Sequence, residues 1–161
     1  MLNTALQVLS KDGTVADNTY QLIGEDGALP QGDVVLTVEQ LDQLANISGR
    51  KALYITVDAS PEVNEFPLDQ LDAIFIEFAG FNDGRGYSFA ALLRRQGYQG
   101  ELRAPGDVFK DVLNYMKRSG FDSFVVKEGK DIQEAAAGLG DFTHPYQAST
   151  AVPQAHYQTG A

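Results

Sequence analysis

The sequence predicts an α/β protein with a mostly parallel sheet of about five strands, helices on both faces and an N-terminal β-hairpin at an edge. One observation is that segments such as 73–78 are continuously apolar, as strands buried on both faces are. A second is that these segments alternate with amphipathic ones, such as 108–116, which is typical of strand–helix–strand units. A third is the pair of Asp-Gly turn signals within the first thirty residues.

The expected elements follow from these patterns in chain order. The hairpin occupies about residues 1–30, with short apolar strands at 6–9 and 20–23. The five main strands are expected at 34–37, 52–57, 73–78, 101–104 and 124–126. Helices are expected after the capping box at Thr37, over 87–96, from Asp107 to just before Gly120, and after Asp131. Residues 1–142 are therefore predicted to form a single domain, and 143–161 an extended or disordered tail.

Composition excludes several classes of function. The 161 residues carry a net charge of −10, which argues against nucleic-acid binding and against docking to an anionic membrane. No apolar run approaches the length of a membrane span, so a cytoplasmic location is expected. The chain contains no cysteine, which excludes disulfides, thiolate nucleophiles and iron–sulfur ligation. We therefore expect no intrinsic cofactor, and redox chemistry would need a borrowed flavin or NADP.

Positive charge is concentrated in one part of this acidic chain. Residues 81–118 contain seven basic and four acidic side chains, a local net charge of +3. Such a zone suits a small anion or an acidic partner surface. For five of the bases, the alternative is that they only solvate helix faces: Arg94, Arg95, Lys110, Lys117 and Arg118.

Polar side chains follow four of the expected strands. Ligands of open parallel sheets bind at the carboxyl ends of the strands, where Asp58, Glu77, Arg103 and Lys127 are expected. A loop with the sequence Phe-Asn-Asp-Gly-Arg-Gly-Tyr-Ser rises from the same edge over 81–88. The predicted binding residues are Glu77, Asp83, Gly84, Arg85, Gly86, Tyr87, Ser88, Arg103 and Lys127. Backbone N–H groups at the start of the following helix, together with Arg85, would form a small-anion cradle. The alternative is a tight structural loop in which Asp83 caps the helix and Arg85 pairs with Glu77.

Other chemistries have weaker signatures. The segment from Gly84 to Phe89 resembles the Gly-x-Gly-x-x-Gly dinucleotide fingerprint, but Phe89 replaces its last small residue. His144 and His156 lie in the expected tail, so neither a zinc site nor a Ser-His-Asp triad is expected. A carboxylate such as Asp58 acting as general base ranks last, because no spacing singles it out.

A longer pattern resembles a known family. It is dense over about residues 78–124 and comprises the 81–88 loop, Leu-Leu-Arg over 92–94, Gly97-Tyr98, Gly-Glu-Leu-Arg-Ala over 100–104, Gly-Asp-Val over 106–108 and Gly-Phe-Asp over 120–122. The pattern is similar to that of a bacterial family of unknown function described as "oxidoreductase probably involved in sulfite reduction". Genes of that family commonly lie beside the gene for sirohaem sulfite reductase.

The resemblance implies a cytoplasmic role in assimilatory sulfur metabolism. We expect an accessory protein of sulfite reduction that uses the strand-end loop to bind a small oxyanion or the sulfite reductase haemoprotein. The alternative is an oxidoreductase that borrows a flavin or NADP to supply electrons for sulfite reduction. Whether the chain is an enzyme is left open by its residues.

Overall fold

The structure is a computed structural model, and it describes residues 6–57, 65–80 and 82–139. Three expectations fall outside these residues: the strand-end residue Asp58, the tail after residue 142 and the two histidines in that tail. Among the described residues, no helix is long and apolar enough to cross a membrane.

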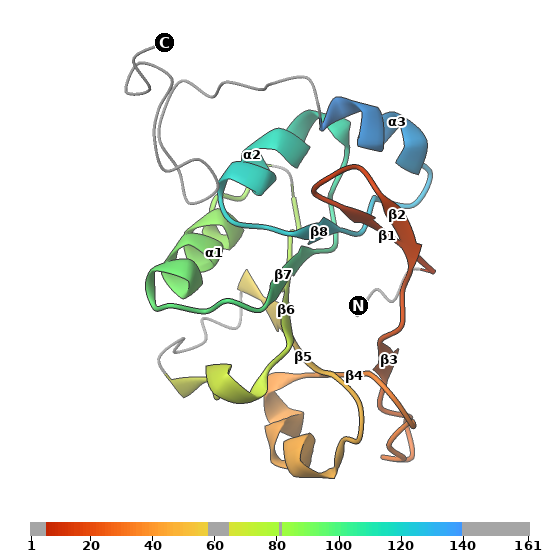
Figure 1. Cartoon of the computed structure of the whole chain (residues 1–161), viewed down its shortest axis with the longest axis vertical. Coiled ribbons are helices and arrows are strands. Elements are labelled where there is room, and N and C mark those ends of the chain that lie inside the picture. The colour runs from red at the N-terminus through yellow and green to blue at the C-terminus, as the bar shows by residue number, and fades with distance from the viewer. Residues whose placement is uncertain (1–5, 58–64, 81, 140–161) are drawn as a thin grey trace.

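An eight-stranded curled sheet organises the described residues (Figure 1). Its strands are β1 (Gln7–Ser10), β2 (Val15–Asp17), β3 (Gln21–Leu22), β4 (Val34–Leu36), β5 (Lys51–Thr56), β6 (Ala73–Glu77), β7 (Glu101–Ala104) and β8 (Ser123–Phe124). Their order across the sheet is β2-β1-β8-β7-β6-β5-β4-β3. Strands β3 to β8 are parallel to one another, whereas β1 pairs antiparallel with both β8 and β2. The α/β class and the mostly parallel sheet are thus confirmed, with more strands than expected.

The N-terminal region differs from the prediction in its pairing. A hairpin does lie at an edge, but it is the short β1–β2 unit, which closes through a turn where Gly13 has φ 91°. The segment predicted as its second strand contributes β3 instead, at the opposite edge of the sheet and parallel to β4. Burial explains the difference, because Tyr20 is only 2% exposed and packs edge-on against Phe75 of β6. This contact carries the chain away from the hairpin before β3 begins.

Apart from a short turn at residues 68–70, the helical segments lie at the places where the sequence predicts them, with one correction. They are η1 (Val38–Asn46), η4 (Leu68–Gln70), α1 (Arg85–Arg95), η5 (Lys110–Val112), α2 (Leu113–Arg118) and α3 (Ile132–Gly138). The Asp131 carboxylate caps α3 by accepting the Gln133 N–H at 2.8 Å. Asp107, however, starts no helix, because the helical turns begin only at Lys110. The Asp107 carboxylate instead accepts a hydrogen bond from Lys127.

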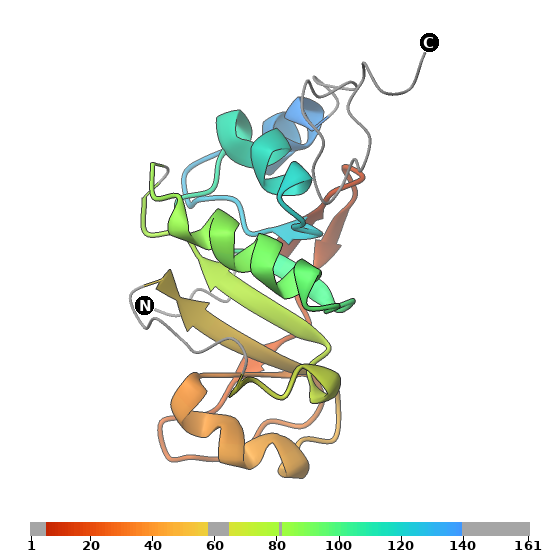
Figure 2. The same ribbon diagram turned by 90° about the vertical axis from the view of Figure 1, so that its left-hand side faces the viewer.

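Two apolar clusters occupy the two faces of the sheet. The larger joins alternate strand residues, such as Ile74 and Ile76, to buried side chains of the helices, such as Leu93 of α1 and Met116 of α2. Figure 2 shows α1 (green) lying across this face of β6. The smaller cluster comprises Tyr20, Val35, Ala52, Tyr54, Ala73 and Phe75. Because side chains alternate along a strand, neighbouring residues of β6 serve different clusters.

Candidate functional site

The Asp83–Arg85 pair lies at the start of α1, at the end of the segment that follows β6. The Arg85 guanidinium donates to the Asp83 carboxylate from Nε at 3.0 Å and from Nη2 at 2.7 Å. The same carboxylate accepts a hydrogen bond from the backbone N–H of Arg85 at 3.1 Å, so it also satisfies an N–H group in the first turn of α1. These hydrogen bonds from Arg85 lower the pKa of Asp83 to about 2. Asp83 is 19% exposed and Arg85 is 54% exposed, so a sheltered carboxylate holds a cation that faces solvent.

Gly86 allows α1 to approach the sheet closely. A Cβ at this position would lie 2.6 Å from Cζ of Phe78, whose side chain is 1% exposed. Gly84 has open space around its Cα, since no atom lies within 4 Å of a Cβ built there. The first turn of α1 is therefore fixed against β6 through Gly86, and this contact sets the position of the Asp83–Arg85 pair.

A second ion pair stands at the same edge of the sheet. Lys127, which follows β8, donates to the Asp107 carboxylate at 2.8 Å. The backbone N–H of Asp107 donates to the Phe78 carbonyl at 2.7 Å, which brings the segment after β7 against the end of β6. Lys127 is 52% exposed and Asp107 is 16% exposed, the same division between cation and carboxylate as in the first pair. We call this region, made of Glu77, Asp83, Arg85, Asp107 and Lys127, the strand-end edge.

Arg103 lies apart from the strand-end edge. It is opposite Phe75 in the register of β6 and β7, and its side chain is 7% exposed. The guanidinium donates to Glu101 at 2.8 Å, to Ser123 at 3.2 Å and to Asn18 at 2.9 Å. It also lies 4.6 Å from the centre of the Phe75 ring. We call Asn18, Glu101, Arg103 and Ser123 the Arg103 cluster.

The remaining predicted residues occupy different surroundings. Glu77 is half-buried at the end of β6 and is opposite Thr56 in register, on the same face as Phe75. Tyr87 packs against Phe78 with 4.9 Å between ring centres, and burial raises its pKa to about 12. Ser88 is exposed in the first turn of α1. The structure thus brings Asp83 and Arg85 together and holds Arg103 by other partners.

Comparison with known proteins gives one match. The family of bacterial proteins of unknown function DUF934 matches residues 52–157, about two thirds of the chain. The chain belongs to this family. Neither a curated protein nor a solved structure matches it. The matched residues extend from β5, without its first residue, beyond α3. They include the strand-end edge and most of the Arg103 cluster.

The order of the strands in the parallel part of the sheet is relevant to the segment that resembles a dinucleotide fingerprint. Doubly wound folds bind dinucleotides where the strand order reverses. Here β3 to β8 are adjacent in chain order, so the described strands have no such reversal. Gly86, the second glycine of the fingerprint-like segment, faces Phe78. These two features favour a structural role for that glycine.

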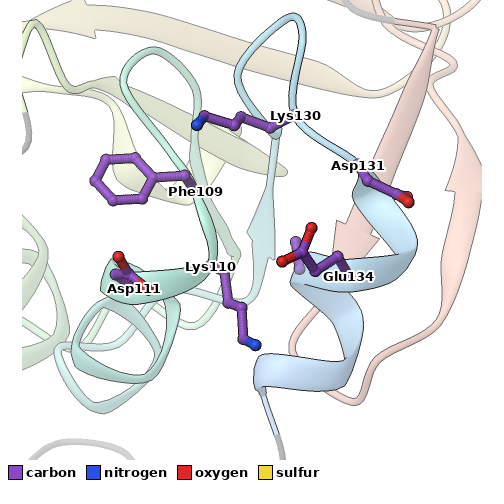
Figure 3. A pocket seen from close by; sticks show the side chains of 7 residues that line it. Phe109, Lys110, Asp111, Lys130, Asp131 and Glu134 are labelled. Carbon is purple, nitrogen blue, oxygen red and sulfur yellow. The ribbon is translucent and has the colours of Figure 1, made fainter.

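The described residues also form a small hollow between η5 and α3 (Figure 3). Its volume is about 150 Å³, and its lining includes Lys110, Asp111, Lys130 and Glu134. Figure 3 shows the ammonium groups of Lys110 and Lys130 pointing in different directions, so their charges do not converge on one ligand position. Within the described ranges, no group of three or more His, Asp or Glu side chains is arranged to hold a metal ion.

Sequence reasoning missed the partners of the basic residues. Glu101 and Arg103 are two residues apart in β7, and the alternation of side chains along a strand was the signal that they share a face. Ser123 and Asn18 come from distant parts of the chain, so only the tertiary structure reveals their contact with Arg103. Asp107 was expected as a helix cap, because an Asp preceding an apolar periodic segment is a usual start signal.

Proposed function

We propose that this chain is an accessory protein of assimilatory sulfite reduction that docks onto sulfite reductase through its strand-end edge. The observation that carries the proposal is the Asp83–Arg85 pair, in which a sheltered carboxylate orients a half-exposed guanidinium. Arginines held in this way lose little freedom on binding and are common at the centres of protein interfaces. The resemblance over 78–124 supports the link to sulfite reduction.

The charge of the edge favours a protein partner over a free oxyanion. Arg85 and Lys127 are each bonded to a carboxylate, and Glu77 adds a further acidic group. A small anion would have to compete with Asp83 and Asp107 for the same cations. A protein surface, in contrast, can contact the exposed parts of both cations and leave the two ion pairs intact.

A binding measurement tests this proposal. The purified chain and the haemoprotein subunit of sulfite reductase are mixed, and their affinity is measured by biolayer interferometry at several salt concentrations. We expect salt-sensitive binding that weakens at least about tenfold in Arg85→Glu and in Lys127→Glu, since reversed charge at an interface is repulsive. Lys51→Glu is the matched control, because it makes the same change in charge at the amino end of β5.

Three outcomes contradict parts of the proposal. Absence of binding by the wild-type chain refutes sulfite reductase as the partner. Equal affinity of all variants shows that the partner binds elsewhere. If calorimetry instead shows that sulfite itself binds saturably and that Arg85→Glu abolishes this, the oxyanion alternative replaces docking.

A further inference from the structure

The two helices beside the strand-end edge contain no acidic residue. Helix α1 reads Arg-Gly-Tyr-Ser-Phe-Ala-Ala-Leu-Leu-Arg-Arg, and α2 reads Leu-Asn-Tyr-Met-Lys-Arg. The whole chain nevertheless carries 22 acidic residues and a net charge of −10. Arg85 and Arg94 are paired with Asp83 and Asp122, whereas Arg95 of α1 is exposed. An exposed cation on a negative protein attracts groups of opposite charge.

The outer side of α1 combines an apolar and a basic side chain. Ser88, Leu92 and Arg95 are spaced four and three residues apart, so they line one side of the helix, and all three are exposed. Leu92 is 36% exposed, which makes it one of only a few large apolar side chains so exposed among the described residues. The side chain of Arg95 forms no hydrogen bond or ion pair with any described residue.

Helix α2 presents a tyrosine that is exposed yet held in place. Tyr115 is 52% exposed, and its ring lies 4.5 Å from the ring of Tyr87, centre to centre. The guanidinium carbon of Arg118 lies 5.4 Å from the centre of the same ring. Tyrosine and arginine are enriched among the residues that dominate binding energy at protein interfaces. Holding the ring in advance reduces the entropy that binding would cost.

Side-chain contacts connect the two helices at both ends. Figures 1 and 2 both show α1 and α2 side by side over the sheet. Near their carboxyl ends, Arg94 of α1 donates to the Gly120 carbonyl at 3.0 Å and pairs with Asp122. Near their amino ends the Tyr87–Tyr115 contact joins them. We call Ser88, Leu92, Arg95, Tyr115 and Arg118 the α1–α2 face.

We infer that the α1–α2 face binds an acidic protein surface that presents apolar side chains to Tyr115 and Leu92. Charge complementarity identifies the occupant, because the exposed Arg95 lies beside the exposed Leu92 on a helix without a carboxylate, and the guanidinium of Arg118 lies over the exposed ring of Tyr115. A second copy of this chain is disfavoured, since two such faces would repel each other. The inference goes beyond the strand-end edge, and it holds whichever protein carries the acidic surface.

A titration followed by NMR tests the inference without sulfite reductase. The ¹⁵N-labelled full chain is titrated with a short peptide of glutamates interspersed with leucine and tyrosine, and with a control peptide in which glutamine replaces every glutamate. We expect saturable shifts confined to α1 and α2 with the acidic peptide, and binding at least about tenfold weaker with the neutral one. Raised salt should weaken the acidic complex.

Two pairs of variants locate the contact. Tyr115→Ala should weaken binding of the acidic peptide by about tenfold or more, whereas Leu6→Ala should leave it unchanged. Leu6 is the matched control because it is 87% exposed and lies outside the face. Arg118→Glu should weaken binding and Lys51→Glu should not. Circular dichroism and the unchanged part of the NMR spectrum show that each variant is folded.

Several results would overturn the inference. They are no saturable binding of the acidic peptide, equal binding of the two peptides, or shifts that map to another part of the molecule. Tighter binding of a DNA duplex than of the acidic peptide at this face would make it a nucleic-acid site instead. Self-association of the wild-type chain that Tyr115→Ala abolishes would make the face a contact between copies. Failure of the haemoprotein to bind would leave this inference intact, so the two proposals fail separately.

Discussion

Arg103 and Arg85 are both arginines that the sequence places near the carboxyl edge of the sheet, yet the structure gives them opposite surroundings. Arg103 is 7% exposed, lies against Phe75 and donates to three side chains of the Arg103 cluster. Arg85 is 54% exposed and is oriented by the carboxylate of Asp83. Arg103 is therefore a buried charge, whereas Arg85 presents its charge to solvent.

The basic residues of the positive zone therefore divide into buried and exposed side chains. Arg94 resembles Arg103, since it is 18% exposed and donates to the carbonyls of Tyr98, Gly100 and Gly120 as well as pairing with Asp122. These two arginines bind together parts of the chain that are distant in sequence. The cations left for function are those at the surface, at the strand-end edge and on the α1–α2 face.

Truncating Arg103 should have the largest effect. Arg103→Ala removes the cationic partner of the Glu101 carboxylate and leaves that charge with only the Ser123 hydroxyl of the cluster, so we expect the free energy of unfolding to fall by about 3–5 kcal/mol. Urea denaturation followed by circular dichroism measures this change. Arg95→Ala is the control and should alter stability by less than about 0.5 kcal/mol. A loss as small as that for Arg103→Ala would remove the distinction between the two kinds of arginine.

Alkaline pH should destabilise the side of the sheet that holds Arg103. Burial raises the pKa of Tyr20 to about 12, against about 10 in an unfolded chain. The unfolded state therefore releases this proton first, and the free energy of unfolding falls between pH 10 and 12 by up to about 2–3 kcal/mol. Tyr20→Phe should make this fall shallower, as measured by urea denaturation at a series of pH values. An unchanged slope in the variant would show that Tyr20 is accessible to water.

The packing beneath the strand-end edge should respond to a single methyl group. Gly86→Ala places a Cβ against the Phe78 ring, so α1 must move away from β6, at a cost of about 1–3 kcal/mol. Gly84→Ala adds the same group in open space and should change stability by only a few tenths of a kcal/mol. Thermal denaturation of the two variants makes the comparison. Equal losses would mean that α1 is not fixed by the Gly86 contact.

Much of the fold could be predicted from local patterns. The apolar runs located β4 to β8 because buried parallel strands need no alternation, and the Asp131 cap located α3 correctly. The strand pairing of residues 20–23 could not be predicted, because β3 is only two residues long and its position in the sheet depends on the burial of Tyr20 against Phe75. The prediction of Asp107 as a helix cap was wrong for a similar reason: its side-chain partner, Lys127, is twenty residues away in the sequence.

The candidate site was predictable only in part. The proximity of Asp83 and Arg85 follows from their spacing in a tight loop, and the structure shows them paired. Arg103 was placed with them because it lies near the end of a strand, but strand position alone does not say to which face a side chain points. The alternation of Glu101 and Arg103 carried that information, and the register with Phe75 completes it.

The smallest effect on stability is expected for a substitution of Arg85, where we expect an effect on partner binding instead. Arg85→Ala removes an ion pair whose guanidinium faces solvent, and pairs at the protein surface contribute little to folding. We therefore expect the urea midpoint of this variant to match that of the wild type, while its affinity for the sulfite reductase haemoprotein falls. Interferometry and denaturation performed on the same preparation measure both quantities. A variant that loses stability and affinity together would place Arg85 with Arg103, as a residue that builds the fold rather than one that presents a charge to a partner.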